Sequence, residues 1–257
     1  MGYSQRQQIR FCDNLSIEIP LGERSMASVS KRELTKQRRA YEKQAIRAVG
    51  VLVKGTGWKK KKNSIFCARE GYLFAASLEV WLNELKVVWR LEVKPMDVDP
   101  VFWSIMNMEE NLEEPLSLRV WGAFVCSAIP VAESEASSSA LSGDEMARDF
   151  LTWAENAAGG FLQENRQRPF SDIVKNQINY RERGAYAATL ICSLITESCL
   201  EEALKVAVDF SSGKRQSVVV HSSEGRSFFE RASAWLRDRT SPATRSDTSS
   251  RISVRYP

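Results

Sequence analysis

The chain has little of what catalytic machinery commonly needs. It contains a single histidine, His221, among 257 residues, so a Ser/His/Asp or Cys/His site would have to use that one imidazole. No Gly-x-Ser-x-Gly motif accompanies it, and we interpret His221 as an exposed turn residue. Gly50 and Gly55 have the spacing of a phosphate-binding loop, but Thr56 follows where that loop needs a lysine. Catalysis by imidazole and nucleotide hydrolysis are therefore not expected.

Cysteine and long apolar runs are also scarce. The cysteines are five, an odd number, and no two of them form a Cys-x-x-Cys pair. This pattern argues against a disulfide framework and a zinc site, and it predicts reduced, mostly buried thiols. No apolar run of eighteen residues occurs, and residues 1–20 lack the apolar core of a secretory signal. We expect a soluble, cytoplasmic protein that makes no contact with a membrane.

What the chain does have is unevenly distributed charge. Residues 31–62 contain twelve lysines and arginines and two acidic residues, a net charge of +10. The whole chain carries only +4, so the remainder carries −6. This asymmetry indicates either an anionic partner or a basic arm that docks on its own acidic body.

The first part of this basic segment is predicted to be a helix from Lys31 to Lys54. Ser30 and Glu33 form a capping box, and Gly55 follows the predicted end. Apolar residues recur at helical spacing along it, at Leu34, Tyr41, Ala45, Ala48, Val49 and Leu52. Because phosphate cannot cover an apolar stripe, this pattern favours docking of the helix on protein.

The second part of the segment, Lys59 to Lys62, follows Trp58. Four clustered lysines attract phosphate without sequence preference, and an exposed tryptophan could stack on a base. Alternatively, Trp58 begins the core and the lysines keep an edge strand from pairing with other chains. The candidate binding residues are Arg38, Arg39, Trp58, Lys59, Lys60, Lys61, Lys62 and Arg90.

After the lysines the hydrophobic period changes to two, which is typical of a sheet. Four strands are predicted, over residues 64–69, 72–82, 87–94 and 116–128, with a short helix beginning near Asp99. Short turns join the first three strands, so we expect an antiparallel meander. In the third strand, Trp89, Leu91 and Val93 should face the core, whereas Arg90, Glu92 and Lys94 should face outward or into a groove.

The rest of the chain is predicted to be helical. Residues 130–142 are rich in Ser, Ala and Glu and are interpreted as a linker. Helical periods then dominate residues 143–239, and residues 184–210 resemble one tetratricopeptide-type hairpin through Cys199-Leu-Glu-Glu-Ala-Leu-Lys-Val-Ala. Residues 1–30 and 240–257 are expected to be a flexible N-terminus and a disordered tail. The predicted fold is α+β: a leading basic helix on a four-stranded antiparallel sheet over 31–129, then an all-helical C-terminal region.

One catalytic arrangement is permitted by the pattern. Glu92-Val93-Lys94 at the end of a strand, with Glu79 on the preceding strand, is similar to the acid and Glu-x-Lys arrangement of restriction-endonuclease-like nucleases. That similarity implies Mg²⁺ held by two carboxylates, and a lysine that stabilises the developing charge. A solvated sheet face produces the same pattern and is the alternative.

Residues 31–160 faintly resemble small bacterial domains of unknown function, some of them immunity-type proteins that neutralise toxins. The resemblance lies in the order basic helix, Gly-Trp-Lys-Lys-Lys-Lys-Asn-Ser-Ile-Phe, hairpin, Leu-Glu-Val and Val-Val-Trp-Arg-Leu. It implies no catalytic residue and no cofactor. The favoured hypothesis is a non-catalytic protein that binds a protein partner, of immunity or accessory type. The alternatives are a metal-dependent nuclease and a nucleic-acid-binding module that uses residues 31–62.

Overall fold

The computed structural model describes residues 30–81, 86–122, 124–137, 143–215 and 227–241. The predictions for residues 1–29, for His221 and for residues 242–257 lie outside the described residues. Within them the fold is α+β, with an antiparallel sheet and a helical C-terminal part. No helix in the described ranges is both long enough and apolar enough to cross a membrane.

The sheet has five strands in the described residues, ordered β1-β2-β3-β4-β5, and every neighbouring pair is antiparallel. The strands are β1 (Lys59–Lys61), β2 (Ser64–Arg69), β3 (Tyr72–Trp81), β4 (Lys86–Pro95) and β5 (Ile129–Ser137). Glu70 and Gly71 join β2 to β3 with φ of 46° and 81°. A tight hairpin turn needs such positive φ at both central residues. The predicted meander is confirmed for β2, β3 and β4.

The structure corrects the prediction in two places. The predicted fourth strand over 116–128 is wrong, because Leu116–Trp121 forms helix α3 and ends at Gly122. The last strand instead lies in the predicted linker, where β5 pairs with β4 over Ile129–Ser137. Short β1 adds a further strand, so the predicted count of four becomes five. The Ser/Ala/Glu composition of β5 has a low strand propensity, so the sequence did not predict a strand here. Pairing with β4 stabilises it, because tertiary context outweighs strand propensity.

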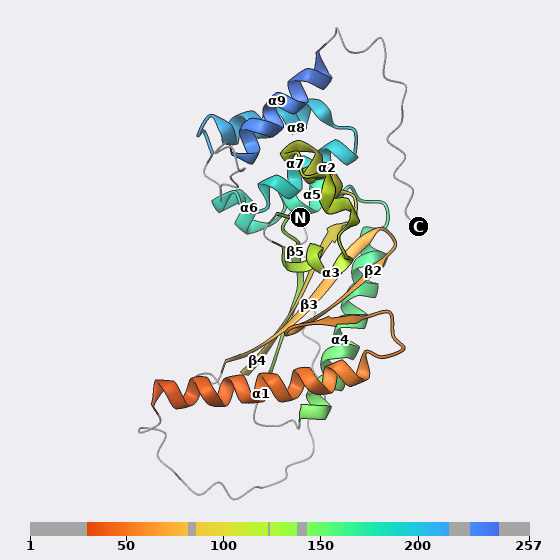
Figure 1. The fold of residues 1–257 in the computed structure, drawn as a ribbon, viewed down its shortest axis with the longest axis vertical. Helices are drawn as coiled ribbons and strands as arrows, with labels where there is room; N and C mark the ends of the chain where they lie inside the picture. The colour runs from red at the N-terminus through yellow and green to blue at the C-terminus, as the bar shows by residue number, and fades with distance from the viewer. Residues whose placement is uncertain (1–29, 82–85, 123, 138–142, 216–226, 242–257) are drawn as a thin grey trace, which may run out of the picture.

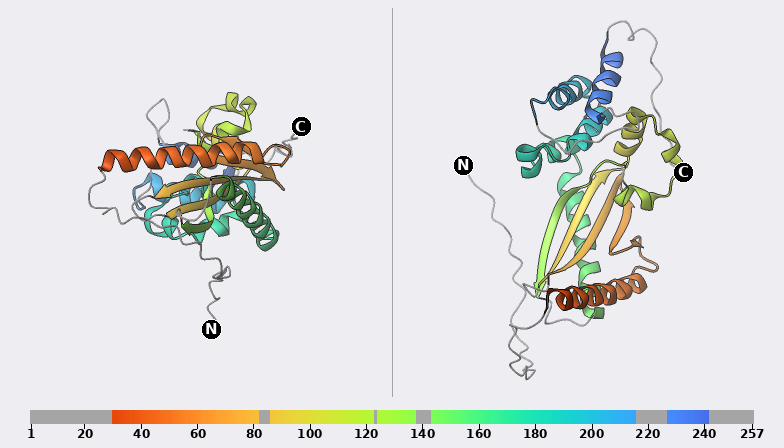
Figure 2. Two further views of the ribbon diagram at one scale, coloured as in Figure 1. Left: turned by 90° about the horizontal axis from the view of Figure 1, so that it is seen from below. Right: turned by 60° about the vertical axis from the view of Figure 1, so that its left-hand side comes forward.

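One face of the sheet is covered by two long helices. Helix α4 (Gly143–Asn165) runs along the sheet, and α1 (Lys31–Leu52) crosses the end of the strands that lies away from the C-terminal helices (Figure 1). Large side chains of β3 and β4, including Phe74, Leu78 and Leu91, are completely buried between these layers. Figure 1 and the left view of Figure 2 show that the N-terminal part of α1 projects beyond the sheet.

The remaining helices gather at the opposite end of the sheet (Figures 1 and 2). They are α2 (Val98–Met106), η3 (Glu109–Glu113), α5 (Phe170–Lys175), α6 (Ile178–Arg183), α7 (Ala187–Thr196), α8 (Leu200–Ser211) and α9 (Phe228–Thr240). The predicted helical pair after Gly184 is present as α7 and α8. Phe102 of α2 stacks on Phe228 of α9 at 5.0 Å between ring centroids. One continuous hydrophobic core therefore joins the sheet to the helical part.

The predicted register of β4 is confirmed for its apolar side. Val87, Trp89, Leu91 and Val93 are buried, and Trp89 packs against Phe150 and Trp153 of α4, with ring centroids 6.0 and 5.8 Å away. The opposite side is not uniformly exposed, since Lys94 is buried as well. That placement corrects the expectation for Lys94.

We predict that Trp89→Ala lowers the free energy of unfolding by about 3–5 kcal/mol, because it leaves a large cavity under α4. Urea denaturation would measure the loss. Trp81→Ala is the control, because the Trp81 side chain is 42% exposed and should contribute no more than about 1 kcal/mol. Equal losses in the two variants would contradict the assigned faces.

Candidate functional site

Helix α1 carries a row of basic side chains along one side. Successive residues of an α-helix are rotated by about 100°, so basic residues spaced by four, three, four and four positions lie within an arc of about 80°. They extend about 22 Å along the axis at 1.5 Å per residue. The row, called the basic face below, consists of Arg32, Lys36, Arg39, Lys43 and Arg47, all exposed.

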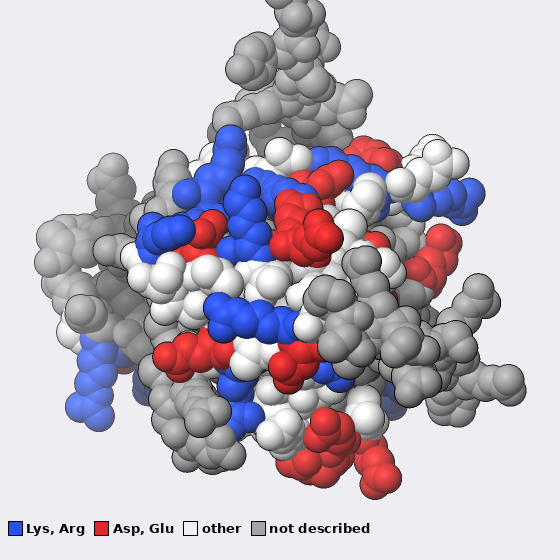
Figure 3. Space-filling model, turned by 90° about the horizontal axis from the view of Figure 1, so that it is seen from above, with Lys and Arg blue, Asp and Glu red and all other residues white. Residues whose placement is uncertain are grey.

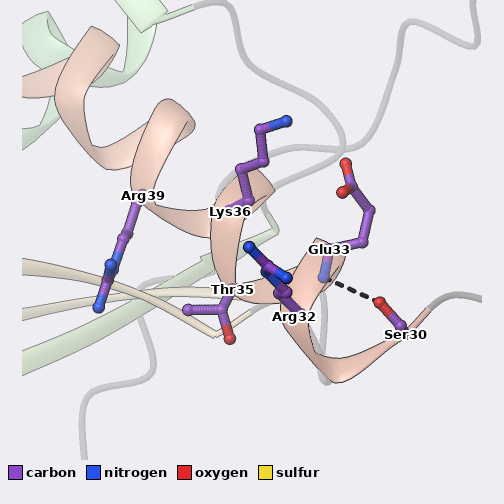
Figure 4. Close-up of a pocket in the computed structure, with 6 residues that line it drawn as sticks. All are labelled: Ser30, Arg32, Glu33, Thr35, Lys36 and Arg39. Atoms are coloured by element: carbon purple, nitrogen blue, oxygen red, sulfur yellow. Dashed lines mark hydrogen bonds between the residues drawn. The ribbon is translucent and has the colours of Figure 1, made fainter.

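Figure 4 looks onto the start of the basic face. Ser30 accepts a hydrogen bond from the backbone N–H of Glu33 at 3.2 Å, which confirms the Ser30 half of the predicted capping box. The side chains of Lys36 and Arg39 diverge in this view, and Arg32 lies between them (Figure 4). These residues line a surface hollow with Ser30, Glu33 and Thr35. The cationic groups therefore spread over a surface wider than the helix backbone.

The basic face is not neutralised by the rest of the described protein. No carboxylate among the described residues forms an ion pair with any of its five cations. Arg38, on another side of α1, pairs with Glu42 at 3.8 Å. Charges of one sign spaced at about 6 Å repel one another unless an anionic partner is present. The surface is thus suited to binding anions.

The opposite side of α1 holds the helix to the body. Ala45 and Val49 are fully buried, and Val53 just after the helix is buried too. A Glu42 carboxylate oxygen accepts a hydrogen bond from the N–H of Val80 on β3, at 3.3 Å. The predicted apolar stripe is therefore covered by the protein itself over Ala45 and Val49. The side chains of Leu34 and Tyr41 lie outside the described residues.

The lysine run of β1 extends the basic surface in part. The Lys60 side chain lies over Gly50 of α1, where an added Cβ would be 2.9 Å from the lysine Cδ. Lys59 and Lys62 are exposed, and Lys62 has a φ of 51° in the turn to β2. Lys61 is half-buried and donates a hydrogen bond to the Ser117 carbonyl oxygen. Three of the four lysines are thus available to a partner.

Trp58, a candidate stacking residue, is part of the core. Only 3% of it is exposed, and its Nε1–H donates to Glu155 of α4 at 2.7 Å. Arg69 binds both carboxylate oxygens of Glu155, at 2.6 and 2.7 Å, with its guanidinium 5.4 Å from the centre of the Trp58 ring. These hydrogen bonds lower the pKa of Glu155, the one from Arg69 most. Trp58 therefore anchors the start of β1 and does not offer a ring to a base.

Charges elsewhere on the described surface are paired or mixed. On the second face of the sheet, Arg90 pairs with Glu133 at 2.9 Å and Lys86 pairs with Glu135 at 3.1 Å. Arg90, another candidate binding residue, thus has its own counterion. At the helical end of the molecule, basic and acidic side chains are interspersed (Figure 3). The basic face of α1 differs from the sheet surface because none of its five cations forms an ion pair with a described residue, although Glu33 and Asp144 border it.

The three residues of the nuclease hypothesis are not brought together. Glu79 lies opposite Val88 and Glu92 opposite Ala75, so the two glutamates are four positions apart along the strands, about 13 Å. Burial raises the pKa of Glu92. No group of three His, Cys, Asp or Glu side chains in the described residues could hold a metal. The geometry does not form the two-carboxylate clamp.

Lys94 instead belongs to a buried ionic cluster. Its Nζ lies 3.0 and 2.9 Å from the two carboxylate oxygens of Asp99, and Arg119 Nε lies 3.0 Å from the same carboxylate. Lys94 also donates to the Cys126 carbonyl at 2.8 Å, and the Cys126 N–H donates to Asp99 at 2.9 Å. Burial lowers the pKa of Lys94, an effect that the Asp99 charge opposes. This cluster ties β4, α2, α3 and the segment before β5 together.

Thiol chemistry is not favoured at the described cysteines of the core. Burial raises the pKa of the Cys67 thiol to about 11 and also raises the pKa of Cys192. A thiol with a raised pKa forms little thiolate, which is the nucleophilic species. The predicted reduced, buried state is confirmed for Cys67, Cys126 and Cys192, whereas Cys199 is exposed.

Sequence reasoning singled out Arg38 and Arg39 but missed Arg32, Lys36, Lys43 and Arg47. Their spacing of four, three, four and four was visible in the sequence, and it is the spacing of one helix side. The chain matches no protein-family model, no curated protein and no solved structure in the comparisons made with it. The functional argument therefore rests on the geometry above.

We predict that Asp99→Ala lowers the free energy of unfolding by about 3–5 kcal/mol, because Lys94 and Arg119 are then left buried without a counterion. Glu133→Ala is the matched control, since it removes a half-exposed carboxylate from Arg90 and should cost no more than about 1 kcal/mol. Denaturant melts of both variants provide the comparison. A loss below about 1 kcal/mol for Asp99→Ala would contradict the cluster.

Proposed function

We propose that the protein is a non-catalytic binding protein that holds an anionic partner on the basic face of α1. The observation that carries this proposal is the row of five exposed cations without a described counterion. The apolar side of α1, including Ala45 and Val49, is already used by the body. The basic face is left for a partner, and near the end of the helix it borders Val51, which is 65% exposed.

Rigidity supports the same proposal. The side chains of Lys43 and Arg47 lose less freedom on binding because the backbone beside them is already held, by the buried Ala45 and Val49 and by the Glu42 hydrogen bond. Lys60 and Lys59 add positive charge beyond the end of the helix. The bound partner would meet a continuous basic surface built from two elements.

We predict that replacing four cations of the basic face weakens retention on immobilised heparin, a general polyanion. The variant is Lys36→Gln, Arg39→Gln, Lys43→Gln and Arg47→Gln, because glutamine keeps the helix propensity of lysine and arginine. The wild type should require distinctly more salt for elution than this variant. Circular dichroism of each variant verifies the fold.

The matched control carries Arg168→Gln, Arg181→Gln, Lys205→Gln and Arg237→Gln. These four residues are exposed and lie in the helical part, so the control has the same net charge as the first variant. It should elute with the wild type. Equal weakening in both variants would show that net charge alone governs retention, and the proposed surface would be wrong.

A second candidate is the protein-binding role of immunity or accessory type that the sequence favours. The observation for it is three exposed apolar side chains within thirteen residues of sequence, Leu112, Leu118 and Phe124, which are 55%, 43% and 45% exposed. Exposed apolar side chains that form one patch are typical of protein interfaces.

The test of this second candidate is capture of a partner from the native host by the full chain. We predict that Leu112→Ser with Leu118→Ser abolishes capture if this role is correct, whereas the four-glutamine variant of the basic face leaves it unchanged. The reverse result would assign the captured protein to the basic face. Capture that survives in both variants would remove this apolar group from consideration.

A further inference from the structure

Resting on the proposed function, we propose that the anionic partner is a nucleic acid duplex, whose phosphate backbone lies along the basic face of α1 without regard to base sequence. The row keeps within an arc of about 80° and is about 22 Å long. A duplex has one phosphate per about 3.4 Å of its axis on each strand, so about six phosphates of one strand fall within this length, and those on the near side can meet the row. A line of like charges on the protein is thus matched by a line of opposite charges.

The chemistry of the row indicates contact with phosphate rather than with bases. Lysine and arginine side chains donate hydrogen bonds and accept none. In the described part of this face, all five long side chains are of these two types. Contacts with phosphates position a protein on a duplex but carry no sequence information. The surface therefore contributes binding affinity that does not depend on the base sequence.

Single strands are a poorer match, because proteins that bind them stack bases on aromatic rings. Trp58, beside the lysine run, is buried and held by Glu155. Trp81 is exposed, but it lies away from the basic face. It follows Val80, whose N–H donates to Glu42, and Glu42 is on a different side of α1 from the basic face. Its ring is also covered by Lys86, whose Nζ is 5.0 Å from the ring centroid. No described aromatic side chain of the basic face is available for stacking.

An acidic protein is also a poorer match. Protein surfaces usually mix charges of both signs, as the helical end of this molecule does (Figure 3). A partner for five cations in a row, none of them paired with a described carboxylate, needs anions spaced every few ångströms. The backbone of a duplex carries regularly spaced phosphates whatever its base sequence. A folded protein would need a surface on which acidic residues alone are placed at the same spacing.

The experiment measures binding of the full chain to three probes by fluorescence anisotropy between 50 and 200 mM salt. The probes are a duplex of about 20 base pairs with random sequence, one of its strands alone, and polyglutamate of the same charge. Each phosphate contact lowers log K by about 0.9 per decade of salt, so five contacts weaken duplex binding about 500-fold over this range. We expect duplex to bind more tightly than either other probe, and equally across sequences.

Variants separate the basic face from general charge. The four-glutamine variant of the basic face should lower the salt slope by about 3.6, and Lys36→Gln with Lys43→Gln alone by about 1.8. The four-glutamine control in the helical part should keep the wild-type slope. The double variant retains three of the five cations, so it tests the slope even if the larger variant does not fold.

Each of the other outcomes contradicts either the duplex inference or the proposed function as well. Tighter binding of the single strand, or a strong dependence on base sequence, overturns the duplex backbone inference. Binding of polyglutamate but not of duplex, lost in the basic-face variant, overturns this inference and leaves the proposed function standing. Binding of no polyanion at all overturns both.

Discussion

The arrangement of the molecule depends on close packing between small residues of α1 and the layer beneath it. Ala45 and Val49 are completely buried, and Gln44 lies so near the start of α4 that a Cβ at Gly143 would be 3.0 Å from its Cγ. Rotating α1 about its axis by one residue position would bury basic side chains against the body without a counterion. That burial would lower the free energy of unfolding by several kcal/mol. The rotation of α1 is therefore set, and its charged side must face solvent.

Much of the fold could be predicted because its pattern is local. The alternation of Val87, Trp89, Leu91 and Val93, the hairpin at Glu70-Gly71 and the cap at Ser30 each depend on neighbours in sequence. The strand β5 could not be predicted, because its stability comes from pairing with β4 and from Glu133 and Glu135 meeting Arg90 and Lys86. The burial of Lys94 depends equally on distant groups, Asp99 and Arg119, that only tertiary structure brings near.

Charge has three different roles in this chain, according to its surroundings. Inside the protein, Lys94, Asp99 and Arg119 satisfy one another and hold elements together. On the sheet surface, pairs such as Arg90 and Glu133 neutralise an exposed strand pair. On the basic face of α1 the five cations are left without described partners. Composition alone counts all of them in the same total, whereas their function depends on whether a counterion is within reach.

The buried ionic cluster also constrains how the sequence can change. One carboxylate, that of Asp99, is the counterion of two cations. A neutral residue at position 99 would therefore leave both Lys94 and Arg119 without a counterion. Loss of either cation would change the charge balance around the other. The three residues therefore depend on one another, and they can be replaced by apolar residues only when all three are replaced together. A single substitution at this junction between sheet and helices is therefore expected to cost more stability than one at the exposed strand pairs.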